Sequence, residues 1–222
     1  MKKYKVIAFD LDGTLTNPES GLIAGFKYAL DAYGIDYGSE ASLKKFIGPP
    51  LQDAWVEEYG VSRETAVEML YKFREFYNVY GWWDNKPYDG VREMLAGLKS
   101  AGKVLVLATS KPQPTAEKVL RLFGLDVFFD FIGGASSDMK RDKKHEVLAY
   151  SLASVGCSEP ERAILVGDRM YDAEGARLCG IDSLGVLWGH GSREEIETSG
   201  FTLVAASPDE VVSCLTRDGR EI

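Results

Sequence analysis

The sequence predicts an α/β fold, a parallel sheet with helices on both faces, together with a small helical domain inserted after the first strand. Three observations predict it: short apolar runs alternate with helical patterns, a polar or glycine-bearing loop closes each clear run, and one long interval has helical patterns without strong strands. A chain of 222 residues can bury one sizeable core plus a smaller insert, although two full-sized domains would be tight.

Six apolar runs are predicted strands, because short apolar runs without alternation are typical of strands buried on both faces. The clear runs are YKVIAFD (4–10), KVLVLATS (103–110), RAILVGD (162–168) and DSLGVLW (182–188), and the weaker ones are VFFDFIGG (127–134) and FTLVAAS (201–207). Helical spacing near 3.6 residues covers 90–101, 113–123, 143–155 and 171–179. Alternating strands and helices form parallel sheets, whose reactive groups lie at the carboxyl ends of the strands.

The alternation breaks once, between residues 17 and 88, where residues 21–34, 51–60 and 63–81 carry helical patterns. We therefore predict a core domain made of residues 1–16 and 88–222 and a helical domain made of residues 17–87. The aromatic stretch FYNVYGWWDNKPY lacks interleaved basic residues, so we interpret it as packing within the helical domain rather than as a platform for bases.

Charge and composition exclude several classes of partner. The net charge is -8 and no run of Lys and Arg appears, which argues against a nucleic-acid polymer. The N-terminal apolar run is too short for a signal peptide and no stretch is long enough to span a bilayer, so we expect a cytoplasmic chain with no membrane partner. Monomer and homodimer are both left open.

Two aspartates, Asp10 and Asp12, stand one residue apart in FDLDGT at the end of the first predicted strand. Residues two apart in a strand point to one face, and the turn that begins at Gly13 and Thr14 lets both carboxylates converge above the sheet edge. Two bare carboxylates there would repel each other. A divalent cation removes that penalty, and ligands that are all oxygen favour Mg²⁺.

Three further sites follow predicted strands or begin the helices after them. Thr109 and Ser110 end the second clear strand, where a hydroxyl can donate to a phosphate oxygen, although turn or cap roles are commoner. Residues 140–144 bring several cations to a helix start, which alone would be a solvated loop. Asp168 and Asp172 in GDRMYD face one side of a helix start, which suits either a metal or an N-cap pair.

These four sites together resemble the four motifs of the haloacid dehalogenase superfamily of phosphotransferases. They are FDLDGT, the Thr109 segment, the lysine near residue 144 and GDRMYD. The resemblance covers nearly the whole chain and is nearest to phosphoglycolate phosphatase-like and 5'-nucleotidase-like members. It implies a Rossmann-like core, and the insert is similar to the helical cap of the superfamily's first subclass, which closes over the site and governs substrate choice.

The resemblance also implies a mechanism. Asp10 would attack phosphorus to form an aspartyl-phosphate, and Asp12 would protonate the leaving alcohol and then take a proton from water. Mg²⁺ would be held by Asp10, the backbone carbonyl of Asp12 and Asp168, with Asp172 binding it directly or through water.

The phosphoryl oxygens would be held by Thr109, by a lysine and by backbone N–H groups that follow Asp10, beginning with Leu11. KHEVL nominates Lys144 for the lysine, with Lys143 as the alternative, and Ser110 is a further candidate for substrate binding.

Two loops are additional candidates for contacts with substrate. In KKFIGPP, Lys45 and Gly48 could reach the substrate, although a surface turn between helices is the simpler interpretation of the segment. In GVLWGHGS, Gly189 and Gly191 would let the backbone pass close to the site, while His190 is expected to be an exposed loop residue.

We therefore predict a Mg²⁺-dependent phosphomonoester hydrolase, phosphoglycolate phosphatase-like, acting on a small phosphorylated metabolite. The alternatives are a 5'-nucleotidase and a phosphomutase of the β-phosphoglucomutase kind. A true dehalogenase is disfavoured because halide release needs no acid at Asp12. A non-catalytic module is disfavoured because none of the four aspartates is lost.

Overall fold

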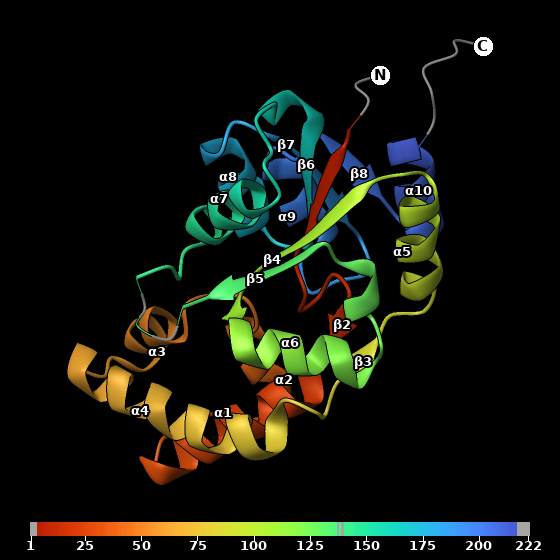
Figure 1. Cartoon of the computed structure of the whole chain (residues 1–222). Helices are drawn as coiled ribbons and strands as arrows, with labels where there is room; N and C mark the ends of the chain where they lie inside the picture. The colour runs from red at the N-terminus through yellow and green to blue at the C-terminus, as the bar shows by residue number, and fades with distance from the viewer. Residues whose placement is uncertain (1–3, 137, 139, 217–222) are drawn as a thin grey trace. The chain divides into compact units, whose positions relative to one another are not determined.

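The computed structural model describes residues 4–136, 138 and 140–216. The described chain divides into two compact units (Figure 1). One runs up to Asn17 and resumes at Pro87, and the other is Pro18–Lys86.

The first unit is built on a parallel sheet of six strands within the described residues. The strands are β1 (Val6–Phe9), β4 (Val104–Pro112), β5 (Phe131–Ala135), β6 (Ala163–Gly167), β7 (Asp182–Val186) and β8 (Leu203–Ala205). Their order is β5-β4-β1-β6-β7-β8, and each pairing is parallel. Phe9 of β1 is in register with Leu107 of β4 and Val166 of β6. The carboxyl ends of these three strands therefore meet at one edge, and the predicted fold class is confirmed.

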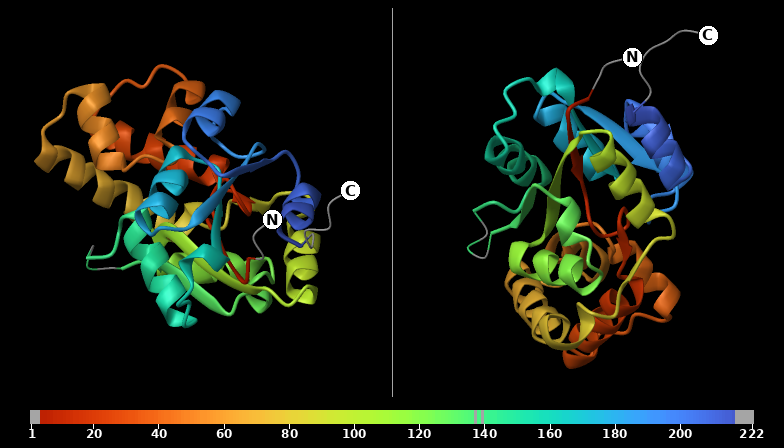
Figure 2. Two further views of the ribbon diagram at one scale, coloured as in Figure 1. Left: turned by 90° about the horizontal axis from the view of Figure 1, so that it is seen from above. Right: turned by 45° about the vertical axis from the view of Figure 1, so that its right-hand side comes forward.

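Helices cover both faces of this sheet. They are α5 (Val91–Ser100), α6 (Gln113–Leu122), α7 (Lys144–Ser154), α8 (Met170–Leu178), α9 (Arg193–Thr198) and α10 (Pro208–Thr216). Val6 and Ala8 of β1 pack with Val147 of α7 and Ala176 of α8. Strand side chains alternate between faces, and α5 and α10 lie side by side against the other face (Figures 1 and 2).

Several elements differ from the sequence-based expectation. The run at 127–134 is a strand only from Phe131, because Asp126–Phe128 form a 3-10 turn. Asp130 lies between that turn and β5, and its carboxylate accepts hydrogen bonds from the Lys99 ammonium and from the Leu105 N–H. The helices α9 and α10 were not anticipated. Most of the C-terminal tail, residues 217–222, lies outside the described residues.

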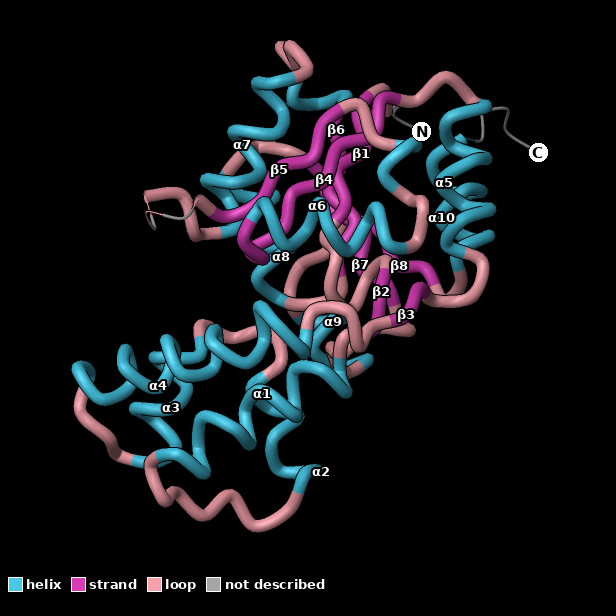
Figure 3. Tube along the Cα trace, turned by 60° about the horizontal axis from the view of Figure 1, so that its bottom comes forward, coloured by secondary structure: helices cyan, strands magenta, loops and turns pink. Residues whose placement is uncertain are grey.

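The second unit is helical (Figure 3). It contains α1 (Glu19–Ala32), α2 (Glu40–Leu43), a 3-10 turn (Lys44–Phe46), α3 (Leu51–Tyr59), α4 (Arg63–Phe76) and a π-helical turn, η2 (Tyr77–Gly81). A separate two-stranded sheet joins β2 (Thr16–Asn17) and β3 (Lys86–Pro87). The single helix expected over 63–81 is thus interrupted: α4 ends at Phe76.

Aromatic side chains form the core of the helical unit. Trp55 is fully buried, Phe26 stacks on Phe73 with ring centroids 5.4 Å apart, and Tyr77 stacks on Phe73 at 5.2 Å. The interpretation of the aromatic stretch as packing is correct for Tyr77. The Tyr80 side chain is exposed but its ring still lies 5.6 Å from that of Phe76, centroid to centroid, whereas the interpretation is wrong for Trp83, whose side chain is exposed. No helix in the described ranges is both long enough and apolar enough to cross a bilayer.

Candidate active site

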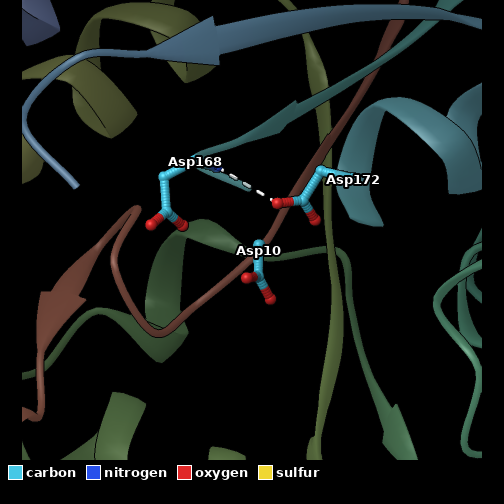
Figure 4. A group of neighbouring side chains, drawn as sticks. All are labelled: Asp10, Asp168 and Asp172. Atoms are coloured by element: carbon cyan, nitrogen blue, oxygen red, sulfur yellow. Dashed lines mark hydrogen bonds between the residues drawn. The ribbon is translucent and has the colours of Figure 1, made fainter. Parts of the chain in front are cut away.

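Three carboxylates meet at the carboxyl edge of the sheet (Figure 4). Asp10 follows β1, Asp168 follows β6 and Asp172 lies in the first turn of α8. One oxygen of each lies within 4.8 Å of the others, and Asp168 and Asp172 are almost completely buried. The Asp10 N–H donates to the carbonyl of Val166 at 2.9 Å, so the β1–β6 ladder sets the spacing of the group.

Lys144 is the cation that faces this acidic group. Its Nζ lies 2.8 Å from Oδ1 of Asp10, 2.8 Å from Oδ1 of Asp172 and 3.2 Å from the carbonyl oxygen of Ala108. Burial lowers the pKa of Lys144, but the two carboxylates outweigh burial and raise it above its usual value, so the side chain stays charged. Lys143 is exposed at the helix start. The structure brings Lys144, not Lys143, to the carboxylates.

Asp168 is strongly desolvated. Burial raises its pKa to about 8, and the neighbouring charges of Asp172 and Asp10 add to the shift. Two hydrogen bonds oppose the shift: Thr14 Oγ1 donates to Oδ1 at 3.0 Å and the His190 N–H donates to Oδ2 at 2.8 Å. A divalent cation bound among the three carboxylates would offset their mutual repulsion and the cost of ionising the buried Asp168.

Asp172 caps a helix as well as facing the group. Its Oδ2 accepts the backbone N–H groups of Asp168 and Arg169, each at 3.1 Å, while Oδ1 faces Lys144. Burial raises the pKa of Asp172 and the lysine opposes that shift. Both sequence interpretations of this aspartate, capping and membership of the acidic site, describe part of what it does.

Asp12 is paired differently from Asp10. Its carboxylate lies outside the three-aspartate group, and Oδ2 forms an ion pair with Lys111, a buried lysine of β4. Thr109 is buried on the same side of the strand and accepts the Lys111 N–H at 3.3 Å, whereas Ser110 between them is exposed. Lys111 was not anticipated. The sequence held no clear signal for it, because the pairing of β4 with β5 is irregular after Thr109 and simple alternation does not apply there.

Glycines let the backbone approach Asp168 closely. A Cβ added at Gly13 would lie 2.1 Å from Asp168 Oδ2, one at Gly189 would lie 2.3 Å from Asp168 Cβ, and one at Gly191 would lie 2.1 Å from the Asp168 carbonyl oxygen. Gly189 and Gly191 therefore pass close to the site, as expected. The expectation of an exposed His190 is wrong: its side chain is partly buried, and its backbone N–H donates to Asp168.

The remaining candidates contact the site only through backbone or lie elsewhere. The Leu11 side chain is fully buried, and its carbonyl accepts the N–H groups of Leu15 and Thr16 at 2.9 and 3.0 Å, so only its backbone N–H could reach a substrate. Lys45 and Gly48 belong to the helical unit, where Lys45 Nζ lies 2.6 Å from Glu58 Oε1. Their contact with substrate stays a prediction.

A comparison with protein families decides the class of this site. The model of the haloacid dehalogenase-like hydrolase family matches residues 7–186, a range that contains Asp10, Asp12, Thr109, Lys144 and the GDRMYD segment. The chain belongs to the haloacid dehalogenase-like hydrolases.

Relatives of this hydrolase include proteins with different names. It is 38% identical over 213 residues to a tyrosine-protein kinase, PtkA, of Mycobacterium tuberculosis, covering 95% of this chain and 72% of the relative. It is 39% identical to a 5'-nucleotidase of Pseudomonas aeruginosa, covering 87% of each. A crystal structure of a predicted phosphatase from Clostridium acetobutylicum matches with a TM-score of 0.91 and 38% identity, covering 96% of this chain and 98% of the other. The hydrolase is a phosphatase-type enzyme.

The contact between Gly13 and Asp168 gives a prediction for this hydrolase. Gly13 has φ +87°, and Gly13→Ala is expected to cost at least about 3 kcal/mol, because a left-handed residue gains a Cβ that collides with a buried carboxylate. Gly156→Ala is the matched control, since φ there is +66° and nothing lies within 4 Å of the added Cβ. It should cost only about 1 kcal/mol. Urea unfolding of both variants measures the change in the free energy of unfolding. Equal losses of stability would contradict the close approach of Gly13 to Asp168.

Proposed function

We propose that this hydrolase cleaves phosphomonoesters of small metabolites through an aspartyl-phosphate on Asp10, with Mg²⁺ bound at the acidic group. The observation that carries the proposal is the setting of Asp10. This carboxylate ends the central strand, lies beside two further aspartates, and has one oxygen held by Lys144 at 2.8 Å. A fixed nucleophile with a metal-binding group on one side and a cation on another is what phosphoryl transfer requires.

The donor set fits a hard cation. Asp10, Asp168 and the backbone carbonyl of Asp12 would hold Mg²⁺, whose preferred ligands are oxygens in a compact arrangement. Asp172 would act through a metal-bound water, because its two oxygens already face two backbone N–H groups and Lys144. When bound, the ion neutralises negative charge on the phosphoryl oxygens.

The residues of this chain carry the proton and bond changes. The Asp10 carboxylate attacks phosphorus as the bond from phosphorus to the ester oxygen breaks, and Asp12 gives that oxygen its proton. Asp12 then removes a proton from the water that attacks the aspartyl-phosphate, which restores Asp10 and releases phosphate. Thr109, Lys144 and backbone N–H groups of the turn after Asp10 hold the phosphoryl oxygens.

The substrate class is argued from charge and from the relatives. A chain with net charge -8 that carries two lysines at the acidic end of its sheet suits a small phosphate rather than a polyanion. Phosphoglycolate-like carboxylate phosphates are the first candidates. Nucleoside 5'-monophosphates are the second, favoured by the 39% identity to a 5'-nucleotidase.

A substrate panel tests the proposed function. Phosphoglycolate, nucleoside monophosphates, hexose phosphates, pyrophosphate and an aryl phosphate are each incubated with Mg²⁺ and with chelator, and phosphate release is measured. Hydrolysis of at least one monoester that stops with chelator supports the proposal. Activity that survives the chelator contradicts the metal requirement. Isomerisation that needs a sugar bisphosphate would indicate a mutase, and transfer from ATP to a tyrosine peptide would indicate a kinase.

Metal binding also predicts a change in stability. Mg²⁺ at about a hundred times its Kd should stabilise the protein by about 3 kcal/mol, because it binds the folded state only. Thermal unfolding with Mg²⁺ and with chelator measures the shift. Asp168→Asn should reduce the shift to near zero, and Asp182→Asn, whose aspartate accepts a hydrogen bond from Tyr4 and begins β7, should retain it. Equal shifts in both variants would place the metal elsewhere.

A further inference from the structure

We propose that Lys111 is a positioning residue for Asp12: its ion pair with Oδ2 fixes the orientation in which that carboxylate exchanges a proton with the leaving group. The inference deepens the proposed function and rests on it, because Asp12 has this task only if an ester is cleaved. Oδ2 of Asp12 forms the ion pair with Lys111.

The burial of Lys111 shows that the pair is built into the site. Its side chain is only 4% exposed, against 23% for the side chain of Asp12. A lysine is almost never buried to this degree without a paired charge, because desolvating an ammonium group costs several kcal/mol. The surrounding fold therefore fixes the more buried Lys111, and Lys111 in turn fixes the carboxylate of Asp12.

An irregularity in β4 aims Lys111 at Asp12. The β4–β5 ladder pairs Thr109 with Gly134 and then Pro112 with Ala135, so its register skips Ser110 and Lys111. Such a bulge redirects side chains and is common beside active sites. A Cβ added at Gly134 would lie 2.7 Å from the carbonyl oxygen of Lys111, so the absence of a side chain at Gly134 admits the bulge.

The two buried lysines pair with different carboxylates of the site. Lys144 pairs with Asp10 and Asp172, while Lys111 pairs with Asp12. Removal of Lys111 would leave Asp12 free to rotate, and a displacement of about 1 Å in a reacting group can cost about 10²-fold in rate. The loss of activity should be greatest for esters whose leaving group must be protonated by Asp12.

The experiment compares esters whose leaving groups differ in their need for a proton. An alkyl phosphate releases an alkoxide that must be protonated, whereas p-nitrophenyl phosphate releases a stable phenolate. General acid catalysis contributes roughly 10²–10⁴-fold, so Lys111→Met should lower kcat/KM for the alkyl ester at least about tenfold more than for the aryl ester. We compare kcat/KM because it reports only the steps up to alcohol release and excludes hydrolysis of the aspartyl-phosphate. Lys111→Arg, which keeps the cation, should restore most of the alkyl activity.

A double-mutant cycle separates positioning from direct phosphate binding. In an Asp12→Asn background, Lys111→Met should change the alkyl-to-aryl ratio by less than about twofold, since a residue that acts through Asp12 has nothing left to position. Lys103→Met is the matched control: Lys103 is also buried, precedes the same strand at its other end, and donates to the Tyr4 carbonyl at 2.7 Å. It should lower stability without changing the ratio. Lys111→Gln is measured beside Lys111→Met, in case the methionine variant does not fold. The same change in the alkyl-to-aryl ratio is expected for both variants.

The outcomes distinguish the inference from the function. Equal losses on both esters, or a Lys111→Met effect that persists undiminished in the Asp12→Asn background, would overturn the role of Lys111 while ester hydrolysis stands. A wild-type enzyme that hydrolyses neither ester would overturn the proposed function itself.

Discussion

Replacing Asp10 with asparagine is expected to reduce kcat on any accepted ester by at least about 10⁴-fold, because the amide cannot form the covalent intermediate. The fold should survive, since the substitution removes one carboxylate from a crowded acidic group and Lys144 keeps its contact with Asp172. Steady-state assays with a matched thermal melt measure both effects.

The control for this variant is an aspartate at the opposite end of the sheet. Asp182 begins β7 and accepts a hydrogen bond from the Tyr4 hydroxyl at 2.7 Å. Asp182→Asn should keep kcat within a few-fold of wild type. If Asp10→Asn retained more than about one hundredth of the wild-type kcat, the assignment of the nucleophile would be wrong.

Replacing Lys144 with methionine is expected to damage both stability and activity. Removing one partner of a buried ion pair costs about 3–5 kcal/mol, and here two buried carboxylates, those of Asp10 and Asp172, lose the same cation. Activity should fall by at least about 10²-fold, since a cation on the transferring oxygens is lost as well. Urea unfolding and kcat measure the two effects separately.

Lys143→Met provides the comparison, because Lys143 is the preceding residue and is exposed. It should change the free energy of unfolding by less than about 0.5 kcal/mol and leave kcat close to wild type. Comparable losses in the two variants would mean that the lysine at the acidic group had been misassigned.

The sequence predicted the parts of this site that follow from strand order. Asp10, Thr109 and Asp168 each end an apolar run, and parallel pairing brings the ends of such runs to one edge. The resemblance nominated Lys144 over Lys143, and Lys144 is the lysine that contacts the carboxylates, but strand order alone does not choose between them. Adjacent residues at a helix start point about 100° apart, and only the packing of α7 against α8 decides which one faces the sheet edge.

The remaining features depend on contacts between segments that are distant in the sequence. Lys111 reaches Asp12 because β4 is bulged, and a bulge depends on its partner strand. The hydrogen bond from Thr14 to Asp168 joins residues 154 positions apart. Periodicity also placed the strand at residues 127–134 too early, because aromatic side chains suit a turn beside the sheet as well as a strand.

The most direct test of the central claim is the location of the phosphoryl group during turnover. The wild-type enzyme, Asp12→Asn and Asp10→Asn are each mixed with p-nitrophenyl phosphate and Mg²⁺, quenched in acid within one turnover, digested and analysed by mass spectrometry. The account predicts one phosphoryl group on Asp10, in larger amount in Asp12→Asn because the base for its hydrolysis is missing, and none in Asp10→Asn. Release of phosphate with no adduct, or an adduct on any other side chain, including a tyrosine, would contradict it.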